Sequence, residues 1–207
     1  MKIFQRVTAY ARNEKAGGEG WESGAGMEDG EMTDGKISDN EKRVCSFLDG
    51  LGIGYEIHRH EAVYTVDEVV ATGNMLPGMN VKNLVIKDKR TDSHYLVIVD
   101  DFRRLDFKHF AEVTGWSKKA RFADEEDLEK YLGLTRGSCS LFGIINDTED
   151  HVKVVLGSEV HTAAPGEIIN FHPNDNTVTL SITIADMFRF LDSMGNEVIL
   201  EPPEEQA

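Results

Sequence analysis

The chain contains 207 residues, of which 40% are hydrophobic and 29% are charged. This length provides one ordinary domain with a sizeable core and some chain left over, and the composition is typical of a soluble globular protein. No apolar run approaches the roughly 20 residues that a membrane-spanning helix needs, so we expect no membrane partner. The two cysteines, Cys45 and Cys139, form neither a disulfide framework nor a metal cluster. This favours a reducing compartment, and we expect a cytoplasmic protein.

The net charge of −15 is unfavourable for tight, sequence-independent binding of nucleic acid, which depends on neutralising phosphates. The charge is unevenly spread, however. Between Lys82 and Arg121 there are ten Lys or Arg and six Asp or Glu, a local net charge of +4 that leaves −19 for the rest. A locally basic face on an acidic protein is compatible with transient contact with RNA.

Both ends of the chain differ in composition from the middle. Residues 1–38 are rich in Gly and acidic residues, as in 17–20 and 24–31, and show neither helical nor strand periodicity. Such segments bury too little apolar surface to offset the cost of ordering the backbone. We therefore expect a disordered extension over 1–38, a folded domain over 39–200 and a short disordered tail over 201–207.

The periodicity of apolar residues predicts a mixture of helices and strands. A helix begins after Ser38, which can cap it, and further helices begin at Thr65, Asp106 and Asp124. A last helix covers 185–194. The predicted strands are 55–58, 83–88, 94–99, 120–123, 152–156, 168–171 and 177–182, with a hairpin between the second and the third. Because strands and helices do not alternate regularly, we expect an α+β fold.

One candidate for binding or catalysis is Lys82. A turn at Pro77 and Gly78 leads into strand 83–88, so that Lys82 stands at the entry of the strand and Asn83 points to the opposite face. A lysine at this place can hold a carbonyl or phosphate oxygen as a compact cation. The same lysine can also be a solvated charge that flanks a strand.

Two loops are further candidates. Strand 168–171 runs into a polar turn over 172–176, where Pro173 holds His172 in an extended conformation. This rigid loop can line a site or can merely connect two strands. The apolar run that contains Gly143 ends in Asn146, Asp147 and Thr148, which are good turn residues, and there the structural interpretation is favoured.

Motifs of well-known catalytic classes are absent from the sequence. There is no G-x-S-x-G, no P-loop, no H-E-x-x-H and no C-x-x-C. His58 and His60 lie on one face of a predicted strand, but the spacing supplies no third metal ligand. We therefore expect neither a metal nor a cofactor.

Taken together, the order and spacing of several short segments resemble the prolyl-tRNA editing family, which includes YbaK-like proteins and the editing insertion of bacterial prolyl-tRNA synthetases. The similarity is greatest to the free-standing ProX-type alanyl-tRNA(Pro) deacylases, and it runs from about Lys42 to Leu200. The segments that carry it are Leu51-Gly52-Ile53, His60, Val63-Tyr64-Thr65-Val66, Pro77-Gly78, Lys82-Asn83-Leu84, Lys87-Asp88, Gly137-Ser138, Phe142-Gly143, Ile145-Asn146-Asp147-Thr148 and Phe171-His172-Pro173-Asn174-Asp175.

The resemblance implies a compact α+β domain with a mixed, curved sheet that hydrolyses the ester of a mischarged tRNA, above all Ala-tRNA(Pro). It implies Lys82 as the catalytic residue and a substrate-binding set of Asn83, Thr65, Gly143, His172 and Pro173. The implied partners are the aminoacylated acceptor end of tRNA and prolyl-tRNA synthetase. The sequence departs from the family at Glu61-Ala62, where two prolines are usual, and at Met79-Asn80-Val81, where Gly-His-Thr is usual. The alternative is a binding module of the same fold without hydrolysis.

Overall fold

The computed structural model describes residues 37–60 and 76–203. The predicted extension, apart from its last two residues, and the predicted helix that begins at Thr65 lie outside these residues. So does the end of the predicted tail. None of the described helices is long and apolar enough to cross a membrane.

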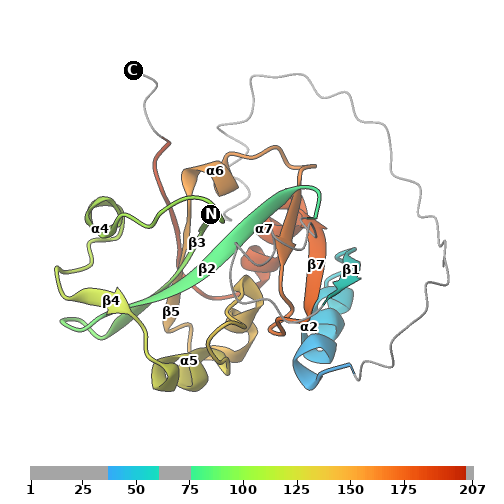
Figure 1. Cartoon of the computed structure of the whole chain (residues 1–207), viewed down its shortest axis with the longest axis horizontal. Coiled ribbons are helices and arrows are strands. Elements are labelled where there is room, and N and C mark those ends of the chain that lie inside the picture. The colour runs from blue at the N-terminus through green and yellow to red at the C-terminus, as the bar shows by residue number, and fades with distance from the viewer. Residues whose placement is uncertain (1–36, 61–75, 204–207) are drawn as a thin grey trace.

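A mixed sheet of eight strands forms the centre of the molecule (Figure 1). Seven strands follow in the order β1-β7-β6-β2-β3-β5-β8, and β4 pairs with the C-terminal end of β2. The pairs β2–β6, β3–β5 and β5–β8 are parallel and the others are antiparallel. The strands are β1 (Glu56–Arg59), β2 (Met79–Asp88), β3 (Ser93–Asp100), β4 (Ala120–Phe122), β5 (Val152–Leu156), β6 (Ile168–Phe171), β7 (Val178–Thr183) and β8 (Val198–Leu200).

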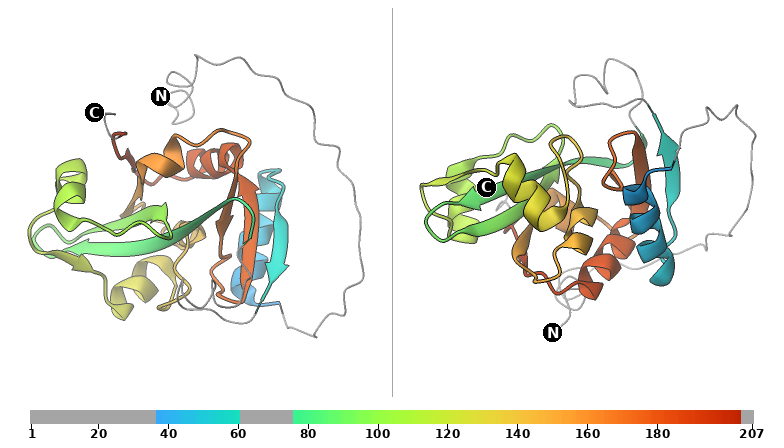
Figure 2. Two further views of the ribbon diagram at one scale, coloured as in Figure 1. Left: turned by 45° about the horizontal axis from the view of Figure 1, so that its top comes forward. Right: turned by 90° about the horizontal axis from the view of Figure 1, so that it is seen from below.

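The sheet is mixed, as the resemblance implies, and it is strongly twisted. Figure 2 shows the long hairpin of β2 and β3 running across the direction of β6, β7 and β1. As a result β2 pairs along its N-terminal part with β6 and along its C-terminal part with β4. The N-terminal part of β2 therefore lies where β1, β7 and β6 meet the other strands of the sheet, and these two regions of the sheet have different surroundings.

Short polar caps start most of the helices. The side chains of Ser38, Asp106, Asp124 and Thr183 accept hydrogen bonds from backbone N–H groups in the first turn of the helix that each precedes. The helical elements are α2 (Asp39–Gly50), α4 (Phe107–Thr114), α5 (Glu125–Leu132), the 3₁₀ helix η1 (Leu141–Asn146), α6 (Ser158–His161) and α7 (Ile184–Ser193).

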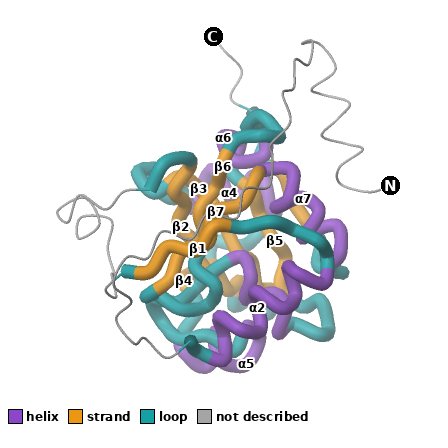
Figure 3. The backbone as a smooth tube through the Cα atoms, turned by 90° about the vertical axis from the view of Figure 1, so that its right-hand side faces the viewer, coloured by secondary structure: helices purple, strands orange, loops and turns teal. Residues whose placement is uncertain are grey.

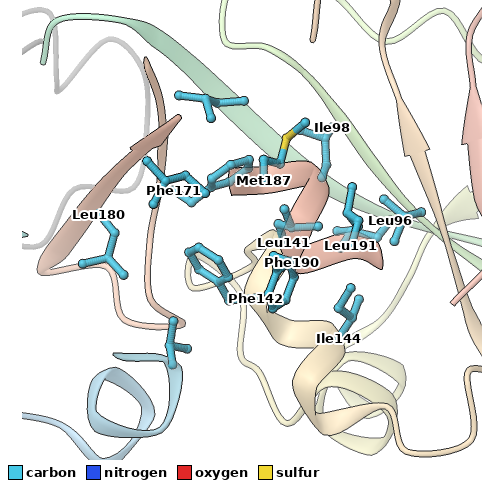
Figure 4. Packing of buried hydrophobic residues seen from close by; sticks show 14 of the residues in the cluster. Leu96, Ile98, Leu141, Phe142, Ile144, Phe171, Leu180, Met187, Phe190 and Leu191 are labelled. Carbon is cyan, nitrogen blue, oxygen red and sulfur yellow. The ribbon is translucent and has the colours of Figure 1, made fainter. Parts of the chain in front are cut away.

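The main hydrophobic core lies on one face of the sheet, against α2, α5, η1 and α7 (Figure 4). Phe142 of η1 packs edge-on against Phe171 of β6 and Phe190 of α7, with ring centroids 5.6 and 5.2 Å apart. Figure 3, viewed towards the β1 edge, shows α2 and α7 beside the strands, where Phe47 contacts Phe190. Continuous burial of these aromatic rings provides much of the stability of the domain.

A second, smaller cluster fills only part of the opposite face. Phe110 of α4 and Trp116 pack there on residues of β2, β3 and β5, including Ile86, Val97 and Val155. No residue of β1, β6 or β7 belongs to this second cluster. The part of the face over these three strands is therefore left to other side chains.

The C-terminal end of the domain is held by a buried carboxylate. The side chain of Glu201 is 2% exposed, accepts hydrogen bonds from Arg103 and from the backbone N–H of Ser158, and pairs with His109. These contacts hold the pKa of Glu201 at about 2, although burial alone would raise it. The folded domain therefore extends at least to Glu201, one residue beyond the predicted boundary.

Several elements differ from the prediction. β2 begins at Met79 instead of Asn83, so Lys82 lies inside the strand and not at its entry. The apolar run before the predicted turn at Asn146, Asp147 and Thr148 is the 3₁₀ helix η1, and neither it nor α6 nor β8 was predicted. These elements are three to six residues long, too short for a recognisable period.

Candidate active site

A row of polar side chains occupies the face of β1, β7 and β6 that the second cluster leaves uncovered. In β7, Val178, Leu180 and Ile182 point into the main core, so Thr179 and Ser181 point to the opposite face. The same alternation places Asn170 of β6 opposite the core residues Ile169 and Phe171, and its partner Asn80 in β2 shares this face. The sheet thus has an apolar side and, over these strands, a polar side.

Backbone carbonyls fix the direction of the hydrogen bonds along this row. The amide group of Asn80 donates to the carbonyl of Leu76 (3.1 Å), so its side-chain oxygen is an acceptor for Asn170 (3.1 Å). Asn170 also donates to the carbonyl of Pro77, and its own oxygen accepts from the Ser181 hydroxyl (2.6 Å). Because the Ser181 proton is directed to Asn170, the contact of 2.9 Å with His58 has the imidazole Nε2–H as donor.

His172 continues the polar face beyond Asn170. Its Nδ1 lies 2.7 Å from the carbonyl oxygen of Val178, which can only accept, so Nδ1 carries the proton. Burial lowers the pKa of His172, and the nearby His60, whose ring centroid is 5.7 Å away, lowers it further. His60 in turn contacts the Thr179 hydroxyl through Nε2 (2.9 Å). A neutral His172 presents Nε2 as a hydrogen-bond acceptor.

Lys82 lies on the same face, at the junction between the polar row and the second cluster. It is two residues after Asn80 in β2 and two residues before Leu84, which packs in that cluster. Its Nζ donates to the carbonyl oxygen of Asp101 at 2.8 Å. Because β2 and β6 are parallel, Lys82 and His172 lie two residues beyond the paired Asn80 and Asn170 in the same direction. The structure therefore brings these two predicted residues to one region.

Two other predicted residues lie on the core side of the sheet. Asn83 falls between Val81 and Val85, which pack against the main core, and its buried Oδ1 has no hydrogen-bond partner among the described residues. Gly143 is buried in η1, where an added Cβ would come within 2.7 Å of Leu134. The sheet thus separates both from Lys82, and their role in substrate binding stays a prediction.

Pro173 follows His172 directly, in a loop that is fastened to the core side. The side chain of Asn174 donates to the carbonyl of Phe142 (3.3 Å), and its own carbonyl accepts from Asn40 (3.1 Å). This loop is the link between η1 and the polar face. Thr65 lies outside the described residues.

Comparison with known proteins places the chain in a family. The family model for the aminoacyl-tRNA editing domain matches residues 60–190, which include both Lys82 and His172. The chain belongs to the aminoacyl-tRNA editing domain family. This editing domain is 34% identical to the prolyl-tRNA editing protein ProX of Acetoanaerobium sticklandii over 158 residues, which are 76% of this chain and 94% of that protein.

Other relatives of the editing domain extend the similarity to animals and to solved structures. It is 31% identical to the prolyl-tRNA synthetase associated domain-containing protein 1 of Bos taurus, over 74% of this chain and 89% of that one. A crystal structure provisionally described as a trans-editing enzyme for prolyl tRNA synthetase has the same fold. The TM-score is 0.60 and the identity 19%, with 79% of this chain and 96% of that chain covered.

The sequence did not lead us to Asn80, Asn170 or Ser181, which form the centre of the polar row in the editing domain. A signal was present, since polar and apolar residues alternate in 178–183 and in 169–172. This alternation indicates a strand with one polar face. It does not indicate which polar faces meet, because strand order is set by the tertiary fold.

Proposed function

We propose that this editing domain is a free-standing deacylase that acts in trans, in the cytoplasm, on mischarged tRNA, with Ala-tRNA(Pro) as its substrate. Its partners are then the acceptor end of tRNA and, through the shared tRNA, prolyl-tRNA synthetase. The similarity to ProX supports the reaction class. The observation that carries the proposal is the placement of Lys82 and His172 on one polar face, two residues beyond the paired Asn80 and Asn170.

Lys82 provides a fixed cation for the ester. An ammonium group has three N–H donors, and the carbonyl of Asp101 takes one of them. The contact anchors Nζ and leaves two donors for the ester carbonyl or a neighbouring ribose oxygen. As water adds to the ester carbon, negative charge develops on the carbonyl oxygen, and a preorganised cation stabilises it.

His172 provides an acceptor beside this cation. With Nδ1 committed to Val178, the lone pair of Nε2 can accept a hydrogen bond from the attacking water or from the free ribose hydroxyl of the substrate. The reaction breaks the ester C–O bond, releases alanine and returns the proton to the ribose oxygen. An aminoacyl ester is already activated, so positioning of water and polarisation of the carbonyl are sufficient.

The described side chains favour water over a protein nucleophile. Ser181 directs its proton to Asn170 and not to His58, so His58 does not act as its base. Burial raises the pKa of Cys139 to about 11, which keeps it a thiol and a poor nucleophile near neutral pH. Burial also raises the pKa of Cys45.

The selectivity for alanine follows from size. A synthetase pocket shaped for proline excludes the smaller alanine weakly, because missing methylene groups are worth only about 1–3 kcal/mol. A second, smaller pocket that admits alanine and rejects proline corrects this error. The substituted segment Met79-Asn80-Val81 borders Lys82 and is where we expect this size limit to be set.

The test is hydrolysis of labelled Ala-tRNA(Pro), Pro-tRNA(Pro) and Ser-tRNA by the full chain and by Lys82→Ala. We expect selective release of alanine, and a loss of about 10²–10³-fold in kcat for Lys82→Ala, as when an oxyanion donor is removed. Lys42→Ala is the matched control, because Lys42 is exposed on α2 and pairs only with Asp39 among the described residues. Failure to hydrolyse any aminoacyl-tRNA in a wider panel would favour the alternative, a binding module of the same fold.

A further inference from the structure

An exposed aromatic ring stands beside the candidate site, in the turn that follows β3. Phe102 is 64% exposed, the most of any large hydrophobic residue in the described part of the chain. Packing explains the other rings of this region, since Phe107 and Phe110 of α4 both contact Trp116. Within residues 37–60 and 76–203, Phe102 stacks on no other aromatic ring. A phenyl ring that is 64% exposed contributes little to the stability of the fold, and most of its surface is left for a partner.

The turn holds its backbone firmly. The N–H of Arg103 donates to the carbonyl of Asp100 (3.0 Å), and the N–H of Phe102 donates to the carboxylate of Asp100 (2.8 Å). The N–H of Asp101 donates to the carbonyl of Asn80 in β2 (3.1 Å). Hydrogen bonds from three consecutive backbone N–H groups thus fix the position of the backbone that carries Phe102.

The same turn contacts the proposed catalytic group. The carbonyl of Asp101, the residue before Phe102, accepts the hydrogen bond from Nζ of Lys82. Phe102 is therefore one residue from the atom that anchors the ammonium. A ligand that places an ester at Lys82 must pass close to this turn.

Of the basic side chains near Phe102 in the sequence, one is paired with carboxylates of the described residues and two are not. Arg103 is neutralised by Glu159 and Glu201 and lies over the ring of Phe110, 5.2 Å from its centroid. Arg104 and Lys108 are exposed and have no ion pair recorded within the described segments. Two exposed cations within six residues of the exposed ring are thus left for an anionic partner.

Two of the neighbouring acidic groups, Asp100 and Asp106, are directed towards backbone donors. Asp106 accepts from the N–H groups of Lys108 and His109 as the cap of α4, and Asp100 accepts from Phe102. Asp101 is half-buried, and burial, followed by the nearby Asp100, raises the pKa of its carboxyl group. Asp100 and Asp106 are thus engaged by backbone donors, whereas Arg104 and Lys108 are exposed.

We propose that Phe102 is a stacking platform for the terminal base of the single-stranded 3′ end of tRNA, with Arg104 and Lys108 contacting the phosphates behind it. This inference rests on the proposed function, because the ester at Lys82 fixes which nucleotide comes next to the turn. An exposed aromatic ring with basic neighbours is the arrangement by which proteins bind single strands, since every base has a flat face. Phe102 is then a positioning residue that aligns the ester with Lys82.

The test measures binding of an uncharged RNA hairpin that reproduces the acceptor stem with its 3′ CCA end. We expect Phe102→Ala to weaken binding roughly 5- to 150-fold, the range for one base stacked on an aromatic ring. Phe102→Tyr keeps the ring and should bind like the wild type. Phe122→Ala is the matched control, because Phe122 is 53% exposed but lies on β4 opposite Ile86, about 13 Å further along β2 than Lys82.

A second hairpin with an abasic terminal nucleotide identifies the contact. The wild type should bind this abasic hairpin more weakly than it binds the intact hairpin. The wild type and Phe102→Ala should bind the abasic hairpin with equal affinity. If the folded Phe102→Ala binds the intact hairpin as the wild type does, the stacking proposal is wrong and the ring serves another partner, such as a protein.

Hydrolysis assays separate this proposal from the proposed function. With Ala-tRNA(Pro), loss of stacking should raise KM more than it lowers kcat, whereas Lys82→Ala should lower kcat. If binding of the hairpin depends on Phe102 but the wild type hydrolyses no aminoacyl-tRNA, the proposed deacylase function is wrong and the stacking proposal holds. Hydrolysis that is indifferent to Phe102, together with unchanged binding, would contradict the stacking surface alone.

Discussion

His172 has the side chain whose ionisation is most directly tied to the proposed reaction. Burial lowers its pKa below the ordinary value of 6.5, His60 adds to this effect, and the bond to Val178 and the charge of Asp175 oppose it. Protonation at low pH removes the lone pair of Nε2. We therefore expect kcat/KM to fall as the pH drops through a value below 6.5, after correction for uncatalysed hydrolysis of the ester.

The variant His172→Gln should lack this acidic limb, because an amide can accept a hydrogen bond without titrating. A pH–rate profile with the same limb in the variant would assign it to another group. The free energy of unfolding should change with pH in the same direction as kcat/KM. Below pH 6.5 the unfolded chain binds a proton that the folded His172 resists, so this residue contributes stability at neutral pH that declines as the pH falls through this window.

At the scale of single residues, the structure brings two of the predicted residues together and separates two others from them. Lys82 and His172 were identified, and the structure places both on one polar face. Asn83 and Gly143 were predicted with them, but they lie on the core side of the sheet. Alternation along a strand predicts that neighbours face opposite ways. It does not predict which face a tertiary fold covers.

At the scale of elements, the start of β2 decides where Lys82 stands. Gly78 precedes the strand with φ +96, and an added Cβ would lie 2.6 Å from the backbone oxygen of Ile168 in β6. Only glycine fits this close approach, which aligns Asn80 with Asn170. The sequence predicted a turn at Pro77 and Gly78, but it placed the strand four residues too late, because Met79-Asn80-Val81-Lys82 pairs through contacts with β6 and β3 that no local pattern shows.

We expect Gly78→Ala to destabilise the domain by about 2 kcal/mol or more, since it combines a left-handed backbone with a backbone clash. It should also lower deacylation by shifting Lys82 relative to His172. Gly54→Ala is the control, because Gly54 has open space around its Cα and no positive φ. Urea unfolding and kcat/KM of both variants provide the comparison, and equal stability of the two would show that the approach of β2 to β6 is not tight.

At the scale of the whole molecule, the proposed function requires an acidic protein to bind a polyanion. The net charge of −15 repels RNA, while residues 82–121 carry a local charge of +4. In the structure this segment forms most of β2, β3, α4 and β4, and it includes Lys82, Arg104 and Lys108. Within the described residues, carboxylates from outside this segment pair with Lys87, Arg103 and Arg121. Exposed cations such as Arg104 and Lys108 are therefore the ones left to guide the acceptor end of the proposed substrate, with few phosphate contacts in total.

A small number of contacts predicts a specific dependence on salt. If Arg104 and Lys108 neutralise about two phosphates, the logarithm of the binding constant should fall with the logarithm of the salt concentration with a slope of roughly −1.4 for a single strand to −1.8 for a duplex. This corresponds to about a tenfold weakening of hairpin binding between about 50 and 200 mM salt, measured by fluorescence anisotropy. The double variant Arg104→Ala/Lys108→Ala should approach a flat response, whereas Arg43→Ala, on α2, should keep the slope of the wild type. A slope near zero in the wild type would mean that the uncharged hairpin is bound without phosphate contacts, and a slope much steeper than −2 would mean that further lysines and arginines of 82–121 contact the stem.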